Sequence, residues 1–209
     1  MATFTINENK SDAVVEPAAA KGKWKSIFLY ILVGLVAVVG VLCVVIARRP
    51  DDFKVSQSAT MKASPAAVFE HVNDFHKWEA WSPWAKMDPN AKNSFEGPTS
   101  GVGAKFGWSG NSDVGEGNME IVESKPGELV RVRLDFVRPM EGTSDVQFKI
   151  EPQGDQTVVT WSMAGKNNFM GKAIGLFMDC EKMVGDQYDK GLANLKSIVE
   201  AKPAEPSGS

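Results

Sequence analysis

The stretch SPAAVFEHVNDFHKWEAWSPWAKMD, residues 64–88, decides the fold of this chain. Ser64 can cap a helix, and Pro65 suits the first turn because no backbone donor is needed there. Val68 and Val72 then lie one turn apart and give this helix an apolar face. The sequence therefore predicts a short helix that packs against a core.

Three tryptophans follow this helix. Asn73-Asp74 ends the helix. The segment that follows, with Trp78, Trp81 and Trp84, is interrupted by proline, which predicts a short helix or an ordered loop. Before the helix, residues 53–61 alternate between apolar and polar side chains, as a strand does.

This order of strand, Ser-Pro-started helix and Asn-Asp-Phe-x-x-Trp-x-x-Trp-Ser-Pro-Trp resembles the SRPBCC superfamily, the START-related group that includes polyketide cyclase/dehydrase-like proteins. The resemblance covers about residues 53–200. It implies an α+β helix-grip fold, in which a curved antiparallel sheet wraps around a long C-terminal helix and an apolar cavity. Members of such a fold share the cavity and not one reaction.

The later chain fits that expectation from its own pattern. Alternating segments separated by short turns lie at residues 104–109, 117–123, 130–136, 145–151 and 159–163. They predict an antiparallel meander and argue against a doubly wound parallel sheet. From residue 169 to about 201 no proline occurs and apolar residues recur every three, four or seven positions, which predicts one long amphipathic helix.

An apolar run without any charge, IFLYILVGLVAVVGVLCVVIA, occupies residues 27–47. As a helix it spans about 30 Å, the hydrocarbon thickness of a bilayer. It is longer than the apolar region of a signal peptide and ends at Arg48-Arg49-Pro50 instead of a small-residue cleavage site. The sequence predicts a single-pass transmembrane helix that connects the domain to the membrane.

The resulting organisation has five parts: a flexible tail at 1–26, the transmembrane helix at 27–47, a linker at 48–52, the helix-grip domain at 53–200 and a second tail at 201–209. So short a linker keeps the domain close to the bilayer. Basic residues flank both ends of the apolar run almost equally; the cluster of Lys21, Lys23 and Lys25 favours an N-terminus inside and an extracytoplasmic domain.

Composition excludes some classes of function. With 209 residues and a net charge of −3, the chain lacks the basic surface of a nucleic-acid binder, so no nucleic-acid partner is predicted. Cys43 and Cys180 are the only cysteines, too few for a disulfide framework. Nothing in the sequence determines the oligomeric state.

No catalytic or metal-binding constellation is predicted, and no cofactor. His71 and His76 are not spaced as a helical ligand pair, and a turn separates them. A Gly-x-Ser-x-Gly nucleophile motif does not occur. Acid-base chemistry would need a titratable group on the apolar face; Glu120 and Asp113 could point either way, because a register error of one residue reverses a strand's faces.

The predicted ligand-binding residues are the aromatic and methionine side chains of the apolar faces. They are Trp78, Trp81, Phe106, Trp108, Met119, Phe136, Trp161, Met163, Phe177 and Met178. Such side chains offer adaptable apolar area to a ligand, but the same composition also suits a filled core. The resemblance supports the cavity.

The function that the sequence favours is a membrane-anchored protein that binds an apolar small molecule or lipid between the sheet and the C-terminal helix. Two alternatives stay open. One is a polyketide cyclase/dehydratase-like enzyme, which the resemblance implies for some relatives. The other is an accessory subunit of a membrane complex, although Gly34 and Gly40 are not spaced as a close-packing GxxxG motif.

Overall fold

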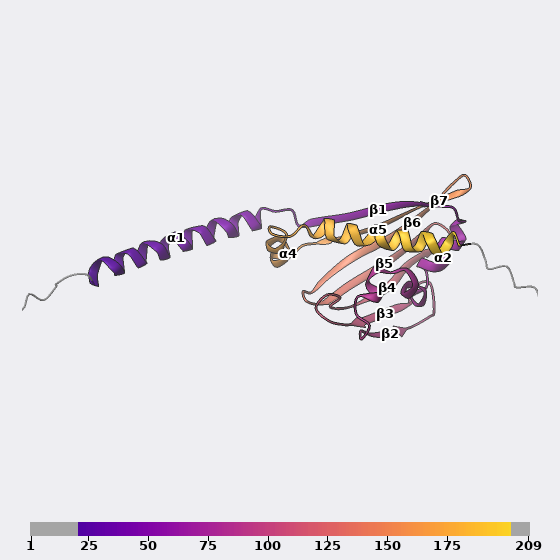
Figure 1. Cartoon of the computed structure of the whole chain (residues 1–209), viewed down its shortest axis with the longest axis horizontal. Helices are drawn as coiled ribbons and strands as arrows, with labels where there is room; N and C mark the ends of the chain where they lie inside the picture. The colour runs from indigo at the N-terminus through magenta and orange to yellow at the C-terminus, as the bar shows by residue number, and fades with distance from the viewer. Residues whose placement is uncertain (1–20, 202–209) are drawn as a thin grey trace, which may run out of the picture. The chain divides into compact units, whose positions relative to one another are not determined.

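Seven antiparallel strands form one sheet in the computed structural model, which describes residues 21–201 (Figure 1). The strand order is β1-β7-β6-β5-β4-β3-β2. The strands are β1 (Asp52–Met61), β2 (Lys92–Glu96), β3 (Lys105–Ser109), β4 (Glu116–Lys125), β5 (Leu129–Arg138), β6 (Gly142–Gln153) and β7 (Gln156–Lys166). The strands from β2 to β7 pair in sequence order, so the predicted meander is confirmed. The first strand, β1, pairs with the last, β7, so β1 and β2 are the two edges of the sheet.

Alternation along the strands sorts the side chains onto an inner and an outer face. In β5, Val130, Val132 and Leu134 are buried, whereas Arg131 and Arg133 between them reach solvent. Residues of one face lie on alternate positions because the side-chain period of a strand is two. The inner faces of β1, β4, β5, β6 and β7 together form the core.

The last helix, α5 (Cys180–Val199), packs on the inner face of the sheet and runs along β1 in Figure 1. Its buried side chains Tyr188, Leu192 and Leu195 recur every three or four residues, as the amphipathic pattern predicted. This arrangement of a curved sheet around a C-terminal helix is the helix-grip fold, and the α+β prediction is confirmed.

The prediction of one unbroken helix from residue 169 is wrong. A short α4 (Phe169–Ile174) comes first and a turn of five residues separates it from α5. Gly175 ends α4, and the Asp179 carboxylate accepts a hydrogen bond from Lys182 N and so starts a new helix. The break follows from glycine's low helix propensity and from a cap inside the apolar pattern.

Two tethers fix α4 to the chain just before β1. Arg49 donates a hydrogen bond from Nη1 to Gly175 O over 2.5 Å, which satisfies a carbonyl at the end of the helix. Lys172 forms an ion pair with Asp51, whose backbone carbonyl also accepts a hydrogen bond from Asn167 N. The segment 49–51 and α4 therefore form one structural piece.

The Asp51 tether should depend on pH. Hydrogen bonding from Lys172 and its charge lower the pKa of Asp51 below its usual 3.8. A carboxylate with a lowered pKa adds stability that is present above its unfolded pKa and is lost as pH falls through the folded one. The stability that this tether adds should stay the same between pH 7 and about pH 5 and fall below about pH 4. Because the pKa values of Glu123 and Glu200 are also lowered, the wild type should lose more stability than Asp51→Asn in thermal unfolding at pH 7 and pH 3. An identical loss in the variant would contradict the assignment.

The segment before β2 has the predicted form. It comprises α2 (Pro65–Val72), a 3-10 turn (Phe75–Lys77), α3 (Trp78–Trp81) and a second 3-10 turn (Pro83–Lys86). The Ser64 side chain accepts a hydrogen bond from Ala67 N, so the predicted cap is present. Asp74 accepts one from His76 N and starts the turn that leads into the tryptophans.

Strand β2 was not predicted. Its sequence, KNSFE, has a single apolar residue, and all five residues are exposed at the edge of the sheet. A strand with so little buried surface carries no alternating pattern, and its pairing with β3 decides its conformation.

Gly191 is buried where α5 crosses Trp161. An added Cβ would lie 2.7 Å from Cζ3 of Trp161 and 3.1 Å from Cδ of Pro83. Overpacking costs about 1–3 kcal/mol, more than the roughly 1 kcal/mol of helix propensity that alanine adds. We expect Gly191→Ala to lower the free energy of unfolding by about 1 kcal/mol, the mid-range overpacking cost less the gain in helix propensity, in denaturant titrations of the full chain in detergent.

Gly142→Ala is the matched control, since no atom lies within 4 Å of the added Cβ. It should change the free energy of unfolding by less than about 0.5 kcal/mol. Equal effects of the two substitutions would show that close packing is not the reason for Gly191.

The remaining helix, α1 (Lys21–Ala47), forms a separate unit that ends at Val45, while residues from Ile46 onward belong to the sheet domain. Residues 24–47 are long and apolar enough to cross a membrane, and nearly all their side chains are exposed. The predicted tails lie largely outside the described residues, so those two predictions stay open.

Candidate functional site

One part of the space between sheet and helix is filled by aromatic rings. Trp161 stacks on Tyr188 with ring centroids 3.9 Å apart, and on Phe148 at 4.9 Å. Trp78 and Trp81 meet Trp161 edge to face at 6.3 Å and 5.4 Å. All five rings are buried, so this part of the interior is a packed core.

Hydrogen bonds hold the two helical tryptophans in place. Trp78 Nε1 donates to Val72 O over 3.1 Å, and Trp81 Nε1 donates to His71 O over 3.3 Å. Burial raises the pKa of Tyr188, which keeps its phenol neutral. Trp161 Nε1 is buried without an acceptor among the described residues.

Another part of the inner face is only half covered. Four side chains from β3, β4 and β5 pack against the core yet keep some exposure, and we call them the apolar wall: Phe106, Trp108, Met119 and Phe136. Phe106 stacks on Trp108 at 6.0 Å, and Trp108 meets Phe136 edge to face at 6.2 Å. The three rings thus form one continuous apolar surface.

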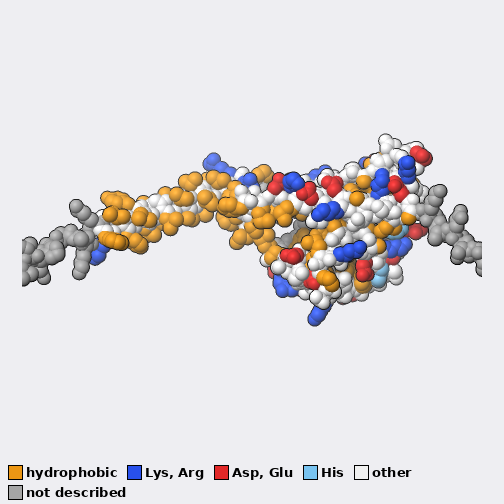
Figure 2. Space-filling model, viewed as in Figure 1, with side chains coloured by type: hydrophobic (Ala, Val, Ile, Leu, Met, Phe, Trp, Pro, Cys, Tyr) orange, Lys and Arg blue, Asp and Glu red, His pale blue; other side chains and the backbone are white. Residues whose placement is uncertain are grey.

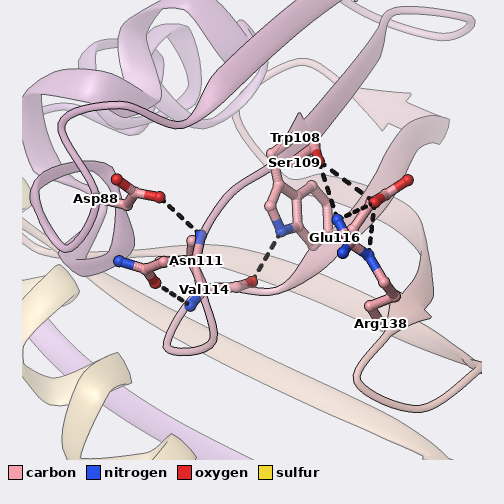
Figure 3. A network of polar contacts seen from close by, with 7 residues as sticks. All are labelled: Asp88, Trp108, Ser109, Asn111, Val114, Glu116 and Arg138. Carbon is pink, nitrogen blue, oxygen red and sulfur yellow. Dashed lines mark hydrogen bonds and ion pairs between the residues drawn. The ribbon is translucent and has the colours of Figure 1, made fainter.

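Gly117 makes room for this wall. An added Cβ would lie 2.5 Å from Cη2 of Trp108, so any other residue would push the indole off the strand. The indole Nε1 donates to Val114 O over 3.0 Å, which fixes the ring's orientation (Figure 3). The loop that carries Val114 is held in turn, since Asn111 N donates to the Asp88 carboxylate over 2.7 Å.

Charged side chains near the wall pair with one another. Arg138 donates from Nε to Glu116 over 2.8 Å, and Ser109 joins the same group (Figure 3). In this pair the charges of the arginine and the glutamate compensate each other. The network therefore stabilises the β3–β4 hairpin behind Trp108.

A hollow is visible at the end of the domain where α5 begins. Figure 2 shows it beneath the first turns of α5, and in the same view of Figure 1 it is bordered by α4 and the neighbouring strands. The connection from α4 and the first turn of α5 carry exposed large apolar side chains: Phe177, Met178 and Met183. The chain thus leaves apolar surface uncovered where α5 begins.

The ten predicted ligand residues consequently fall into three groups. Trp78, Trp81 and Trp161 lie in the packed core, and Met163 of β7 is buried with them. Phe106, Trp108, Met119 and Phe136 form the apolar wall. Phe177 and Met178 lie in the turn between α4 and α5, and their role in binding stays a prediction, as does that of the other eight.

Two further residues of this region were not predicted. Leu134 lies two residues before Phe136 on the inner face of β5. Met183 lies in the first turn of α5. Alternation along β5 could have indicated Leu134. Met183 could not be recognised, because it is exposed and lies outside the buried pattern of α5.

Charged groups lie on the outer face. A depression of about 620 Å³ crosses it, lined by Val122, Arg131, Arg133, Thr143, Ser144, Asp145, Ala164, Gly165 and Lys166. Arg131 pairs with Asp145 at 2.7 Å, and Arg133 pairs with Glu120 at 2.9 Å. Glu120 therefore points outward, and Asp113 lies exposed in a turn.

Among the described residues, Tyr188 is the one titratable side chain that is buried. The buried polar side chains of residues 24–201 are Ser144 and Thr157, and Thr157 donates to Ala63 O over 2.7 Å. His71 bonds to Ala67 O, and His76 bonds to Asp74. No group of three or more His, Cys, Asp or Glu residues that could hold a metal ion occurs among the residues that the structure describes.

The family assignment follows from residues 52–200, which match the model of the family described as "Polyketide cyclase / dehydrase and lipid transport". The chain belongs to this family. The match spans β1 to the end of α5, so the whole sheet domain is a polyketide cyclase/dehydrase and lipid transport domain. The resemblance to the SRPBCC superfamily is thereby confirmed.

Solved structures share the fold of this family domain. A protein from Rhizobium loti superposes with a TM-score of 0.54 at 17% identity, covering 72% of this chain and 99% of the other. A protein from Chromobacterium violaceum gives 0.53 at 15% identity, with 71% and 98% covered. The di-domain ARO/CYC protein BexL from the BE-7585A biosynthetic pathway gives 0.54 at 11% identity, with 76% and 53% covered. The comparison with curated proteins gave no match.

Proposed function

We propose that this chain is a single-pass membrane protein whose family domain binds an apolar small molecule or lipid between the apolar wall and the first half of α5. The observation that carries the proposal is the division of the inner face. Aromatic rings fill one part, whereas Phe106, Trp108, Met119 and Phe136 are only partly buried. Figure 2 shows the hollow at the start of α5.

Apolar burial would supply the affinity. A ligand that covers about 200 Å² of apolar surface gains about 5 kcal/mol before the cost of association. Such a gain alone corresponds to weak binding in water. A domain joined to a bilayer meets lipid-soluble molecules at high local concentration, so moderate affinity is enough.

The character of the wall also defines the ligand class. Its side chains are aromatic rings and a thioether, and Arg138 and Glu116, at the ends of the same strands, pair with each other. A free ionic headgroup would find no partner in such a groove, and burying it unpaired is costly. The ligand we propose is thus an acyl chain, a polyketide-like ring system or a similar uncharged molecule.

Membrane attachment is the second part of the proposal. Residues 24–47 suit a membrane span, and the four residues from Arg48 to Asp51 reach at most about 14 Å before β1 begins. The domain would remain at the membrane surface. Because Lys21, Lys23 and Lys25 precede the apolar run, we place the N-terminus inside and the domain on the extracytoplasmic side.

A photoactivatable lipid tests the proposal in the full chain. Membranes that contain the protein are loaded with an uncharged lipid that carries a diazirine in its acyl chain, illuminated and analysed by peptide mapping. We expect cross-links on β4, β5 and the start of α5, in addition to α1, which serves as the internal reference. Cross-links confined to α1 would refute binding in the domain.

A further inference from the structure

Four large apolar side chains are exposed within ten residues around α4. Phe169 and Met170 of α4 are 53% and 57% exposed, and Phe177 and Met178 of the following turn are 81% and 48% exposed. Single exposed apolar residues are ordinary on a protein surface, but a group of four marks an interaction site. We call these four residues the α4 patch.

The α4 patch is tied to the residues that directly follow the apolar helix. Arg49 donates to Gly175 O over 2.5 Å, and Asn167 N donates to Asp51 O over 2.6 Å. Lys172 pairs with Asp51 while its side chain is only 10% exposed. These contacts hold α4 against a segment that begins two residues after Ala47, the end of α1.

A bilayer is the partner that this linkage favours. If α1 spans a membrane, residues 49–51 lie at its surface, so a patch bonded to them lies at the same level. Phenylalanine and methionine supply the apolar area that interfacial segments bury, and Arg48 and Arg49, which directly follow α1, supply cationic groups at this end of the domain. A soluble protein partner would have to approach at the same level and displace lipid.

We propose that the α4 patch inserts into the interfacial layer of the bilayer that holds α1 and sets the hollow at the start of α5 against the membrane. This inference rests on the membrane attachment in the proposed function. The hollow is bordered by α4 (Figures 1 and 2). An apolar ligand then passes between bilayer and domain without crossing water.

Depth measurements on the full chain test the insertion. Cys43 and Cys180, both exposed, are first replaced by alanine, and a single cysteine is introduced by Phe177→Cys or, as the control, by Asp155→Cys in the β6–β7 turn. Each protein is labelled with an environment-sensitive fluorophore and reconstituted in phosphatidylcholine vesicles that contain spin-labelled lipid. We expect a blue-shifted, lipid-quenched emission at position 177 and water-like emission at position 155.

Water-like, unquenched emission at position 177 would overturn the insertion, even if the lipid cross-links on β4 and β5 persist. Quenching at position 177 together with cross-links confined to α1 would support the insertion and overturn the groove as a binding site. The two proposals therefore fail separately.

A kinetic measurement gives a second readout. The double substitution Phe169→Ser and Met170→Ser removes apolar area from the α4 patch without changing any residue predicted to bind the ligand. We expect it to slow transfer of the photoactivatable lipid from vesicles to the domain by about tenfold and to leave the final yield of cross-links unchanged. An unchanged rate would overturn the insertion as the entry route.

Discussion

Trp161→Ala should lower the free energy of unfolding by about 3–5 kcal/mol, the largest effect on stability that we expect from one substitution. The ring of Trp161 is buried between Tyr188 at 3.9 Å and Phe148 at 4.9 Å, with Trp81 at 5.4 Å. Removing it leaves a cavity in the middle of the aromatic core. Denaturant titration of the full chain in detergent, followed by circular dichroism, measures the effect.

Trp161→Phe separates packing from hydrogen bonding. Phenylalanine keeps an aromatic ring in the stack and removes an indole N–H that has no acceptor among the described residues. An unsatisfied buried donor costs about 1–3 kcal/mol, which offsets part of the lost ring area. We expect a loss below about 2 kcal/mol; a loss equal to that of alanine would show that the aromatic stack is not what Trp161 contributes.

Phe136→Arg should weaken binding of an apolar ligand by at least about tenfold while the domain stays folded. Phe136 is half-buried in the apolar wall, so an arginine there can reach solvent in the free protein but must be covered or displaced when a ligand binds. Displacement of a fluorescent fatty alcohol from the full chain in detergent measures the affinity.

Val137→Arg is the matched control, because it adds the same charge one residue along β5. Val137 is 42% exposed and lies at a bulge in the pairing of β4 and β5, outside the apolar wall. We expect an affinity within about twofold of the wild type. Equal losses for both variants would mean that charge, and not position in the wall, determines the effect.

The fold could be predicted because its elements carry strong periodic patterns. Alternation at 130–136 indicated β5 and its faces, and the uncharged run at 27–47 indicated α1. The tryptophan segment was predicted from its caps and prolines. By contrast, β2 carries a single apolar side chain, Phe95, and its conformation depends on pairing with β3, which no local pattern records.

The kinds of residue in the candidate site could be predicted from the sequence. Which of them are buried and which stay partly exposed could not. Trp161 and Trp108 lie on similar alternating strands, yet one is buried by Tyr188 and the other is left half exposed. What separates them is their place in the sheet: Trp161 of β7 is covered by Tyr188 of α5 and by Trp81, whereas Trp108 lies on β3, near the other edge of the sheet. Such contacts join residues far apart in the chain, which a reading of local sequence does not reach.

Native mass spectrometry of the full chain, released from nanodiscs of its own membrane lipids, tests the binding role most directly. The wild type and Val137→Arg should each carry one apolar molecule that remains after the annular lipids are removed, and Phe136→Arg should be empty. A wild-type protein without a bound molecule, or equal occupancy in all three proteins, would contradict binding at the apolar wall.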